Sequence, residues 1–181
     1  LVEYLSYTCS HCAHFAEEAF GPLKRDYIAK GLVALELRNL IRDQFDLTAA
    51  LLARCGGPSR VFQLTEDMLA RQEVWMAEGQ VVVIRQEAQW KSMPLARQLQ
   101  TLAKGSGLLQ MAQARGLAPA QANACLASEQ MNKTLLAMTK DAVENRKINS
   151  TPSFLINDQP GPRSPRWEDV DAALRAALNA R

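Results

Sequence analysis

Strand-forming patterns occur only near the two ends of this chain, and that distribution restricts the folds open to it. Residues 1–7 (LVEYLSY) and 32–40 (LVALELRNL) are typical of strands, and residues 153–156 (SFLI) are typical of another. A sheet needs several strands to bury an apolar face, so both ends of the chain have to pair in one sheet. A segment near residue 9 is therefore expected to lie close to one near residue 152.

A helical pattern joins the first two strands. Apolar residues recur at near-helical spacing over 9–30, and Gly31 ends the pattern. Strand, helix and strand in this order predict a βαβ unit with a right-handed crossover. Pro22 has no backbone N–H, so we expect the helix to kink near Phe20 and Gly21.

The long middle of the chain carries almost no strand signal. We expect one helix capped by Asp46 and ended by residues 55–57 (CGG), and a second helix over 58–79. Residues 81–84 fit either a helix turn or a short strand. Further helical patterns occur after Pro94, after Pro119 and over 130–147.

The last strand is followed by a turn at Asn157-Asp158 and then by several prolines. Proline cannot donate to a strand ladder, so the second strand of this hairpin is expected to be short and at the sheet edge. Ser164 with Pro165 is typical of a helix start, and this helix should run through Leu178.

Composition excludes several classes of protein. The 181 residues are 48% apolar and 22% charged, with a net charge of +2. This apolar content excludes a disordered tail, and no stretch is long and apolar enough for a membrane span. No basic cluster indicates nucleic-acid binding. The chain begins at Leu1 without an initiator Met or a visible signal peptide, so localisation has to be inferred from the chemistry.

The segment Cys9-Ser10-His11-Cys12 lies where the first strand passes into the helix. Residues i and i+3 at a helix start lie on one face, close enough for a disulfide. Cys9 meets the free N–H groups and positive dipole end of the helix, which favour its thiolate, and His11 could stabilise that thiolate further. Cys9 is therefore the expected exposed nucleophile, and Cys12 the more buried resolving thiol.

Two other interpretations of this pair remain open. The cysteines could be structural, or Cys9, Cys12 and His14 could form part of a zinc site. A structural zinc site needs four ligands, and the remaining cysteines are far away in sequence. We therefore favour a redox-active pair, and we expect neither a metal nor a cofactor.

Thr151-Pro152 lies immediately before the returning strand. A proline there loses a ladder hydrogen bond unless it serves a special turn, and X-Pro bonds are the ones that adopt the cis form at low cost. A cis bond would expose the backbone of Thr151 beside the cysteines, where it could pair with an extended peptide. The alternative is an ordinary trans proline at a strand start.

Together, LVEYLSYTCSHC, the late TPSFLIN and the helical block between them resemble thiol–disulfide oxidoreductases of the DsbA type. The resemblance implies an α/β thioredoxin-like fold with an inserted all-helical domain. The thioredoxin-fold parts would be 1–42 and 148–181, and the inserted domain 43–147.

The resemblance also implies an oxidase of the bacterial periplasm. It would donate disulfides to newly exported, thiol-containing proteins through a mixed disulfide, and a membrane disulfide oxidase would reoxidise it. We expect a monomer that does not bind nucleic acid. A disulfide isomerase or reductase is the alternative within this chemistry, and a non-catalytic chaperone or metal-binding module is the alternative outside it.

Family members carry an acid six residues before the first cysteine, and Glu3 occupies that position. A buried carboxylate there would have a raised pKa and could transfer protons to and from Cys12. The alternative is a surface acid at a strand edge. Two features depart from the family: Ser10 replaces the commoner proline, and the second strand has no lysine to partner Glu3.

Cys55 and Cys125 both fall in the helical block. Some DsbA-like proteins are similar in having an extra disulfide there, which would require an oxidising compartment. Two buried free thiols packed as small apolar groups are the alternative. Neither cysteine belongs to a CxxC motif, so we expect no catalytic role for this pair.

Overall fold

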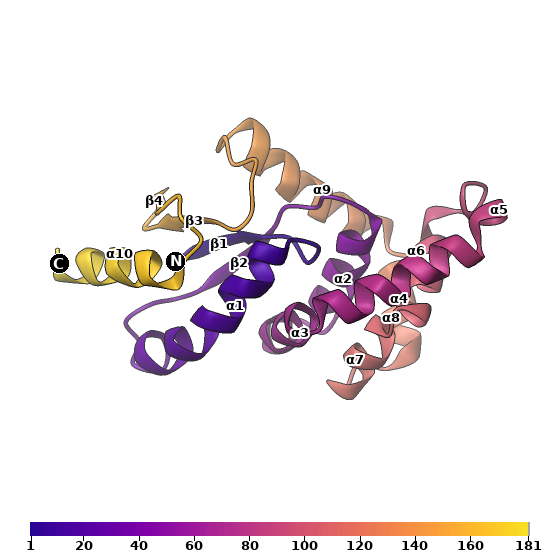
Figure 1. The fold of residues 1–181 in the computed structure, drawn as a ribbon, viewed down its shortest axis with the longest axis horizontal. Coiled ribbons are helices and arrows are strands. Elements are labelled where there is room, and N and C mark those ends of the chain that lie inside the picture. Colours follow the sequence, from indigo (N-terminus) through magenta and orange to yellow (C-terminus); the bar gives the residue numbers. More distant parts are fainter. Residues whose placement is uncertain (181) are drawn as a thin grey trace.

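The computed structural model describes residues 1–180, and its two chain ends meet in one sheet (Figure 1). The strands are β1 (Val2–Leu5), β2 (Glu36–Asn39), β3 (Ser153–Ile156) and β4 (Gln159–Pro160), in the order β2-β1-β3-β4. β1 pairs in parallel with β2 and antiparallel with β3, and β4 is a short edge strand on β3. This confirms the predicted thioredoxin-like α/β fold and the short edge strand. Arg181, which ends the predicted C-terminal part, lies outside the described residues.

Helices make up most of the remaining chain. They are α1 (Ser10–Pro22), the π-helix η1 (Leu23–Ile28), α2 (Gln44–Cys55), α3 (Pro58–Ala70), α4 (Gln72–Arg85), α5 (Glu87–Trp90), α6 (Leu95–Gly105), α7 (Leu108–Ala114), α8 (Pro119–Leu126), α9 (Glu129–Glu144) and α10 (Trp167–Asn179). Figure 1 shows α2–α8 gathered beyond one end of the sheet, while α1 and α9 lie on its opposite sides. The helices α2–α9 stand between β2 and β3 in sequence; domain boundaries at residues 42 and 147 stay a prediction.

Residues of β1 alternate between the two faces of the sheet. Tyr4 belongs to a small buried cluster with Leu155 and Ala142 of α9. Leu5 belongs to the main core, which contains Phe154 and the buried side of α1. Since residues two apart share a face, Glu3 lies on the same face as Leu5, toward α1.

β1 and β2 are shorter than the sequence pattern predicts, whereas β3 has the predicted bounds. Tyr7 leaves the sheet because its N–H binds the Asp46 carboxylate at 2.7 Å instead of a neighbouring strand. β2 begins only at Glu36 because β1 offers a partner for four residues. Residues with a high strand propensity that lie beyond the ends of β1 and β2 have no neighbouring strand to pair with.

The helix containing Pro22 stays α-helical up to that proline and then widens into η1. The disturbance therefore follows Pro22, whereas a kink was predicted before it, near Phe20 and Gly21. A proline leaves the carbonyl four residues earlier without its usual donor, and a wider turn is one local response. Residues 81–84, which the sequence left undecided, are part of α4.

Three predicted helix limits are wrong. Asp43, not Asp46, caps α2, because the Asp43 carboxylate accepts the N–H of Asp46 at 2.9 Å. The single helix predicted over 58–79 is broken at Arg71 into α3 and α4. α10 starts two residues after Pro165, and the Ser164 hydroxyl accepts the nearby Arg166 N–H at 3.4 Å instead of capping the helix.

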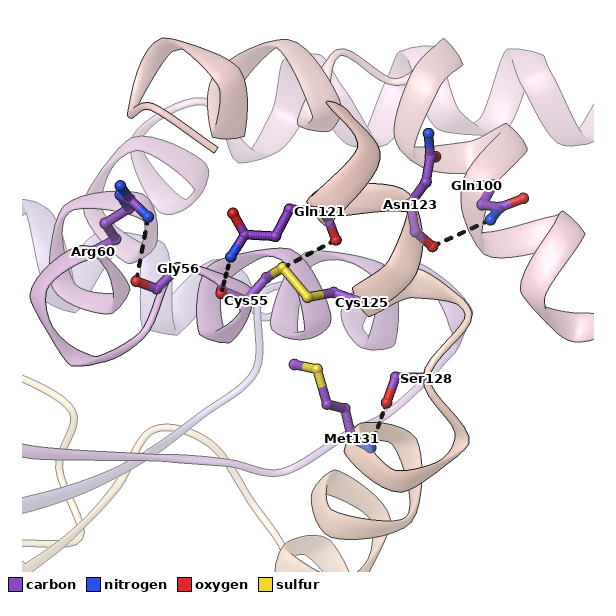
Figure 2. Close-up of a disulfide and its surroundings, with 9 residues drawn as sticks. All are labelled: Cys55, Gly56, Arg60, Gln100, Gln121, Asn123, Cys125, Ser128 and Met131. Carbon is purple, nitrogen blue, oxygen red and sulfur yellow. Dashed lines mark hydrogen bonds between the residues drawn. A yellow bond between two sulfur atoms is a disulfide. The ribbon is translucent and has the colours of Figure 1, made fainter. Parts of the chain in front are cut away.

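A disulfide joins Cys55, the last residue of α2, to Cys125 of α8 (Figure 2). The two Cα atoms are 5.8 Å apart, within the ordinary range for a disulfide. The Gln121 side chain donates to the Cys55 carbonyl at 3.4 Å, so α8 also contacts the end of α2 by a polar bond. No helix among residues 1–180 combines the length and apolar character needed to cross a bilayer.

Candidate active site

Cys9 occupies the N-cap position of α1, where the chain turns from the β1 loop into the helix. Its carbonyl accepts the N–H groups of Cys12 and Ala13 at 3.0 and 3.2 Å, which start the helix. Its sulfur lies 3.2 Å from the Thr151 carbonyl oxygen, to which the protonated thiol donates. Both Cys9 and Cys12 are free thiols, so the structure represents the reduced form. Cys9 is only 4% exposed, so the prediction of an exposed nucleophile is wrong, whereas Cys12 is fully buried and is the more buried thiol, as predicted.

The two thiols have pKa values shifted in opposite directions. The pKa of Cys9 falls to about 4, mainly because the Cys12 thiol donates a hydrogen bond to the Cys9 thiolate. Burial opposes this shift, and the Thr151 side chain and the N–H groups of Cys12 and His11 add to it. The pKa of Cys12 rises well above its ordinary value because of burial, its hydrogen bond with Cys9 and the charge of Glu3. Cys9 is therefore the thiolate of the pair.

Ser10 and His11 are exposed between the two cysteines. The backbone N–H of His11 contributes to the lowered pKa of Cys9. Stabilisation of the Cys9 thiolate by the His11 imidazole ring stays a prediction. A backbone donor depends on the helix start and would persist with another side chain at this position.

Glu3 is completely buried, and neither carboxyl oxygen has a hydrogen-bond partner within the described part of the chain. Its strand neighbours are Leu37 and Phe154, so its surroundings on the sheet are apolar. Burial, with a smaller effect from the Cys9 charge, raises its pKa to about 8. The carboxyl is therefore protonated at neutral pH and lies close enough to influence both thiols electrostatically.

Thr151 and Pro152 approach Cys9 from the start of β3. The peptide bond between them is cis, and the Thr151 carbonyl accepts the Cys9 thiol hydrogen bond. Pairing of β1 with β3 explains this proximity, because it brings the beginning and the end of the chain together.

Asp46 is a site residue that the sequence analysis assigned only to helix capping. Its buried carboxylate accepts the Ser6 hydroxyl at 2.6 Å, the Tyr7 N–H at 2.7 Å and the Arg42 N–H at 3.0 Å. Burial raises its pKa to about 7, although these hydrogen bonds lower it. Asp46 thus attaches the loop before Cys9 to the start of the helical block.

Gln72 is a second residue that the sequence did not reveal. Its buried amide group donates to the carbonyls of Tyr7 and Cys9 at 2.8 and 2.9 Å. Gln72 is the first residue of α4, and the break at Arg71 separates α4 from α3. No local sequence signal could have identified this contact, because it joins residues more than sixty positions apart through the tertiary fold.

His14 does not join the two cysteines. Its ring lies 3.2 Å from the Glu18 carboxylate on the exposed side of α1. Over residues 1–180, no three side chains among histidine, cysteine, aspartate and glutamate gather as a metal site would require. The arrangement at Cys9, Cys12 and Glu3 is instead suited to thiol exchange coupled to proton transfer.

Comparison with known proteins agrees with this fold. A family model described as thioredoxin matches residues 1–176, so the chain belongs to the thioredoxin family. At the level of the fold, the resemblance to DsbA-type proteins is confirmed by the solved neighbours. The crystal structure of α-DsbA1 from Wolbachia pipientis shares the fold, with a TM-score of 0.76 at 17% identity, covering 99% of this chain and 85% of that chain.

Two relatives are more similar in sequence. Protein-disulfide isomerase from Novosphingobium aromaticivorans is 32% identical, with a TM-score of 0.87, covering 98% of this chain and 91% of that chain. A Rickettsia bellii protein named as a protein-disulfide oxidoreductase is 31% identical over 157 residues, which are 87% of this chain and 52% of that protein. The chain spans about half the length of the curated relatives it matches.

Proposed function

We propose that this chain is a thiol–disulfide oxidoreductase that donates its Cys9–Cys12 disulfide to polypeptides with free thiols. The opposite pKa shifts of the two thiols carry this proposal. A pKa of about 4 keeps Cys9 ionised at neutral pH and stabilises the dithiol form. A disulfide whose reduced form is stabilised in this way is a strong oxidant.

The proposed exchange has two steps. A substrate thiolate attacks Cys9 Sγ of the oxidised protein; the Cys9–Cys12 bond breaks, and Cys12 leaves as a thiolate that accepts a proton from Glu3. A second substrate thiolate then attacks the substrate sulfur of the mixed disulfide, and Cys9 leaves as a stable thiolate. The substrate loses two electrons and gains a disulfide, and its released protons restore Glu3 or pass to water.

The substrate backbone would be held by Thr151, whose carbonyl faces Cys9. An extended peptide can pair with the backbone of such a segment as it would with a strand edge. Pro152, which follows it, would keep the turn that presents this carbonyl. In this role Thr151 and Pro152 bind the substrate, and Cys9 reacts with it.

The bacterial periplasm is the proposed location. The Cys55–Cys125 disulfide supports it, since structural disulfides persist in oxidising compartments. The substrates would be newly exported proteins with free thiols. A membrane disulfide oxidase would accept the two electrons and regenerate the disulfide of this chain, which would act as a monomer.

Disulfide isomerisation is the second candidate, favoured by the similarity to the Novosphingobium protein-disulfide isomerase. An isomerase acts in its reduced form, with its thiolate attacking a wrong disulfide of the substrate. The low pKa of Cys9 would serve that attack as well. The reduction potential distinguishes the two activities, because an isomerase has to remain reduced in its compartment.

The test is the redox equilibrium of the Cys9–Cys12 pair with glutathione at pH 5, 6 and 7. Cys9 is ionised in this range, whereas an ordinary thiol with a pKa of about 8.5 stays protonated. Reduction of the protein by glutathione therefore releases one proton, and the equilibrium constant should rise tenfold per pH unit. We expect a potential nearer the roughly −120 mV of DsbA than the roughly −270 mV of thioredoxin.

A potential near the thioredoxin value would support a reductase, and an intermediate value with activity on scrambled disulfides would support the isomerase. Failure of Cys9 and Cys12 to form a disulfide would overturn both. The Cys9→Ser variant serves as the control, since it should lose all exchange while a pure chaperone activity would persist.

A further inference from the structure

A groove runs beside α1 on the side that faces the helical block. Its volume is about 640 Å³, and its lining comes from α1, from the end of α3 and from the start of α4. Ser10, the neighbour of Cys9, lines one end of it. A molecule in this groove would therefore contact the residue that follows Cys9, the thiol that we assign as the nucleophile.

Much of the groove surface is apolar. The apolar lining includes Ala13, Ala16, Phe20, Leu69 and Val74. Val74 is 56% exposed. Beyond the groove lining, Val81 and Ile84 continue along the same side of α4 with exposed fractions of 38% and 61%. From Val74 to Ile84 this stripe extends about 15 Å along the helix. Such a surface suits the apolar side chains of an extended or unfolded chain.

Carboxylates outnumber cations in the groove lining. Glu17, Glu66 and Glu73 line it, against the single guanidinium of Arg71. Lys24 forms an ion pair with Glu66 and neutralises it. Within residues 1–180 the side chains of Glu17 and Glu73 form no ion pair, and both residues are exposed. The chain as a whole has a net charge of +2, so this acidic excess is a local feature.

We propose that this groove binds the segment of a polypeptide substrate that flanks its reacting cysteine, and that it favours segments with a lysine or arginine beside a large apolar residue. The proposal rests on the proposed function, because the mixed disulfide at Cys9 would hold the segment at the groove. The apolar stem of a lysine or arginine can lie on the apolar surface while its charged end reaches Glu17 or Glu73.

The alternatives fit the groove less well. A hollow of this size beside Cys9 suits the side chains of one extended chain, whereas a membrane would meet a flat surface. An acidic excess would also repel anionic lipid headgroups. A substrate joined to Cys9 by a disulfide would be held one residue from Ser10, which lines the groove.

The test compares two dithiol peptides that differ only in the residues flanking one cysteine, Lys-Leu-Lys in one and Glu-Leu-Glu in the other. Stopped-flow fluorescence measures how fast each peptide reduces the oxidised protein. Each rate is divided by the rate of the same peptide with 2-hydroxyethyl disulfide, which removes the effect of its own thiol pKa. We expect the basic peptide to react about tenfold faster at low salt, and the ratio to fall as salt is raised.

The double variant Glu17→Lys/Glu73→Lys should reverse the preference. Glu129→Lys is the matched control, since Glu129 is exposed on α9 and does not line the groove. Equal normalised rates for the two peptides, or the same preference in the double variant as in the parent protein, would overturn the proposal. The parent protein is also tested with glutathione. If glutathione reacts and the peptides show no preference, only the groove proposal fails; if nothing reacts, the proposed function fails with it.

Discussion

The Glu3→Gln substitution should stabilise the reduced protein by an amount that grows with pH. In the folded protein the pKa of Glu3 is raised from 4.5 to about 8. The unfolded chain therefore ionises this carboxyl above pH 4.5, while the folded chain keeps it protonated until about pH 8. Because the folded chain binds the extra proton, its stability decreases as pH rises through this window. Glutamine does not titrate, so the Glu3→Gln variant does not lose stability as pH rises through this window.

The size of this stability difference follows from the shift in the pKa of Glu3. Each pKa unit corresponds to about 1.4 kcal/mol, so the penalty is close to zero at pH 4 and reaches about 3 kcal/mol at pH 7. With a urea m-value of about 2 kcal/mol/M for a chain of this size, the midpoint of unfolding should rise by about 1.5 M at pH 7. A neutral amide and a protonated carboxyl are similarly buried at Glu3, so the two proteins should differ little at pH 4.

The assay is urea unfolding followed by circular dichroism at pH 4 to 8, with a phosphine reductant keeping the thiols reduced. The charge on Cys9 contributes to the raised pKa of Glu3 and is absent in the disulfide form, so the gain should be smaller for the oxidised protein. Glu129→Gln is the control at an exposed carboxylate and should show no such trend. A stability difference between variant and parent that stays constant from pH 4 to 8 would refute the reasoning.

Three other substitutions test separate parts of the structure. Cys12→Ala removes the main donor to the Cys9 thiolate and should raise the Cys9 pKa above about 4, as measured by thiolate absorbance near 240 nm; an unchanged titration would contradict this. Gln72→Leu leaves two buried carbonyls without this donor and should cost about 1–3 kcal/mol in urea unfolding, whereas equal stability would argue against a structural role. Replacing Cys55 and Cys125 by alanine opens a loop with a sequence separation of 70 and should lower the free energy of unfolding by about 4 kcal/mol. The reductant-treated parent is the control, and an unchanged free energy of unfolding would contradict the loop-entropy argument.

The sequence indicates those parts of the site that are built from local patterns. The motif from Cys9 to Cys12 follows a strand and begins a helix, and Thr151-Pro152 precedes the returning strand. Both patterns are short, and pairing of the chain ends brings them together. The strand periodicity also predicts this pairing and the bounds of β3, although it overestimates the lengths of β1 and β2 because pairing partners limit them.

The contacts of Asp46 and Gln72 could not be predicted in this way. Each depends on the direction in which a helix of the middle block approaches the loop before Cys9. A periodic pattern over 58–79 predicts one continuous helix, whereas the chain breaks at Arg71 and places Gln72 against the loop. Such a break depends on tertiary hydrogen bonds, and local propensity carries little information about it.

Asp46 and Glu3 are two buried carboxyl groups that differ in their hydrogen bonding. Both are fully buried, so desolvation raises the pKa of each. Asp46 has three donors around it and a pKa of about 7, and these bonds fix the loop that carries Cys9. Glu3 has no partner among the described residues and a pKa of about 8, so no bond has to break when its proton moves. A carboxyl without hydrogen bonds stabilises the fold poorly, and for the same reason it suits the proton exchange with Cys12 that we propose.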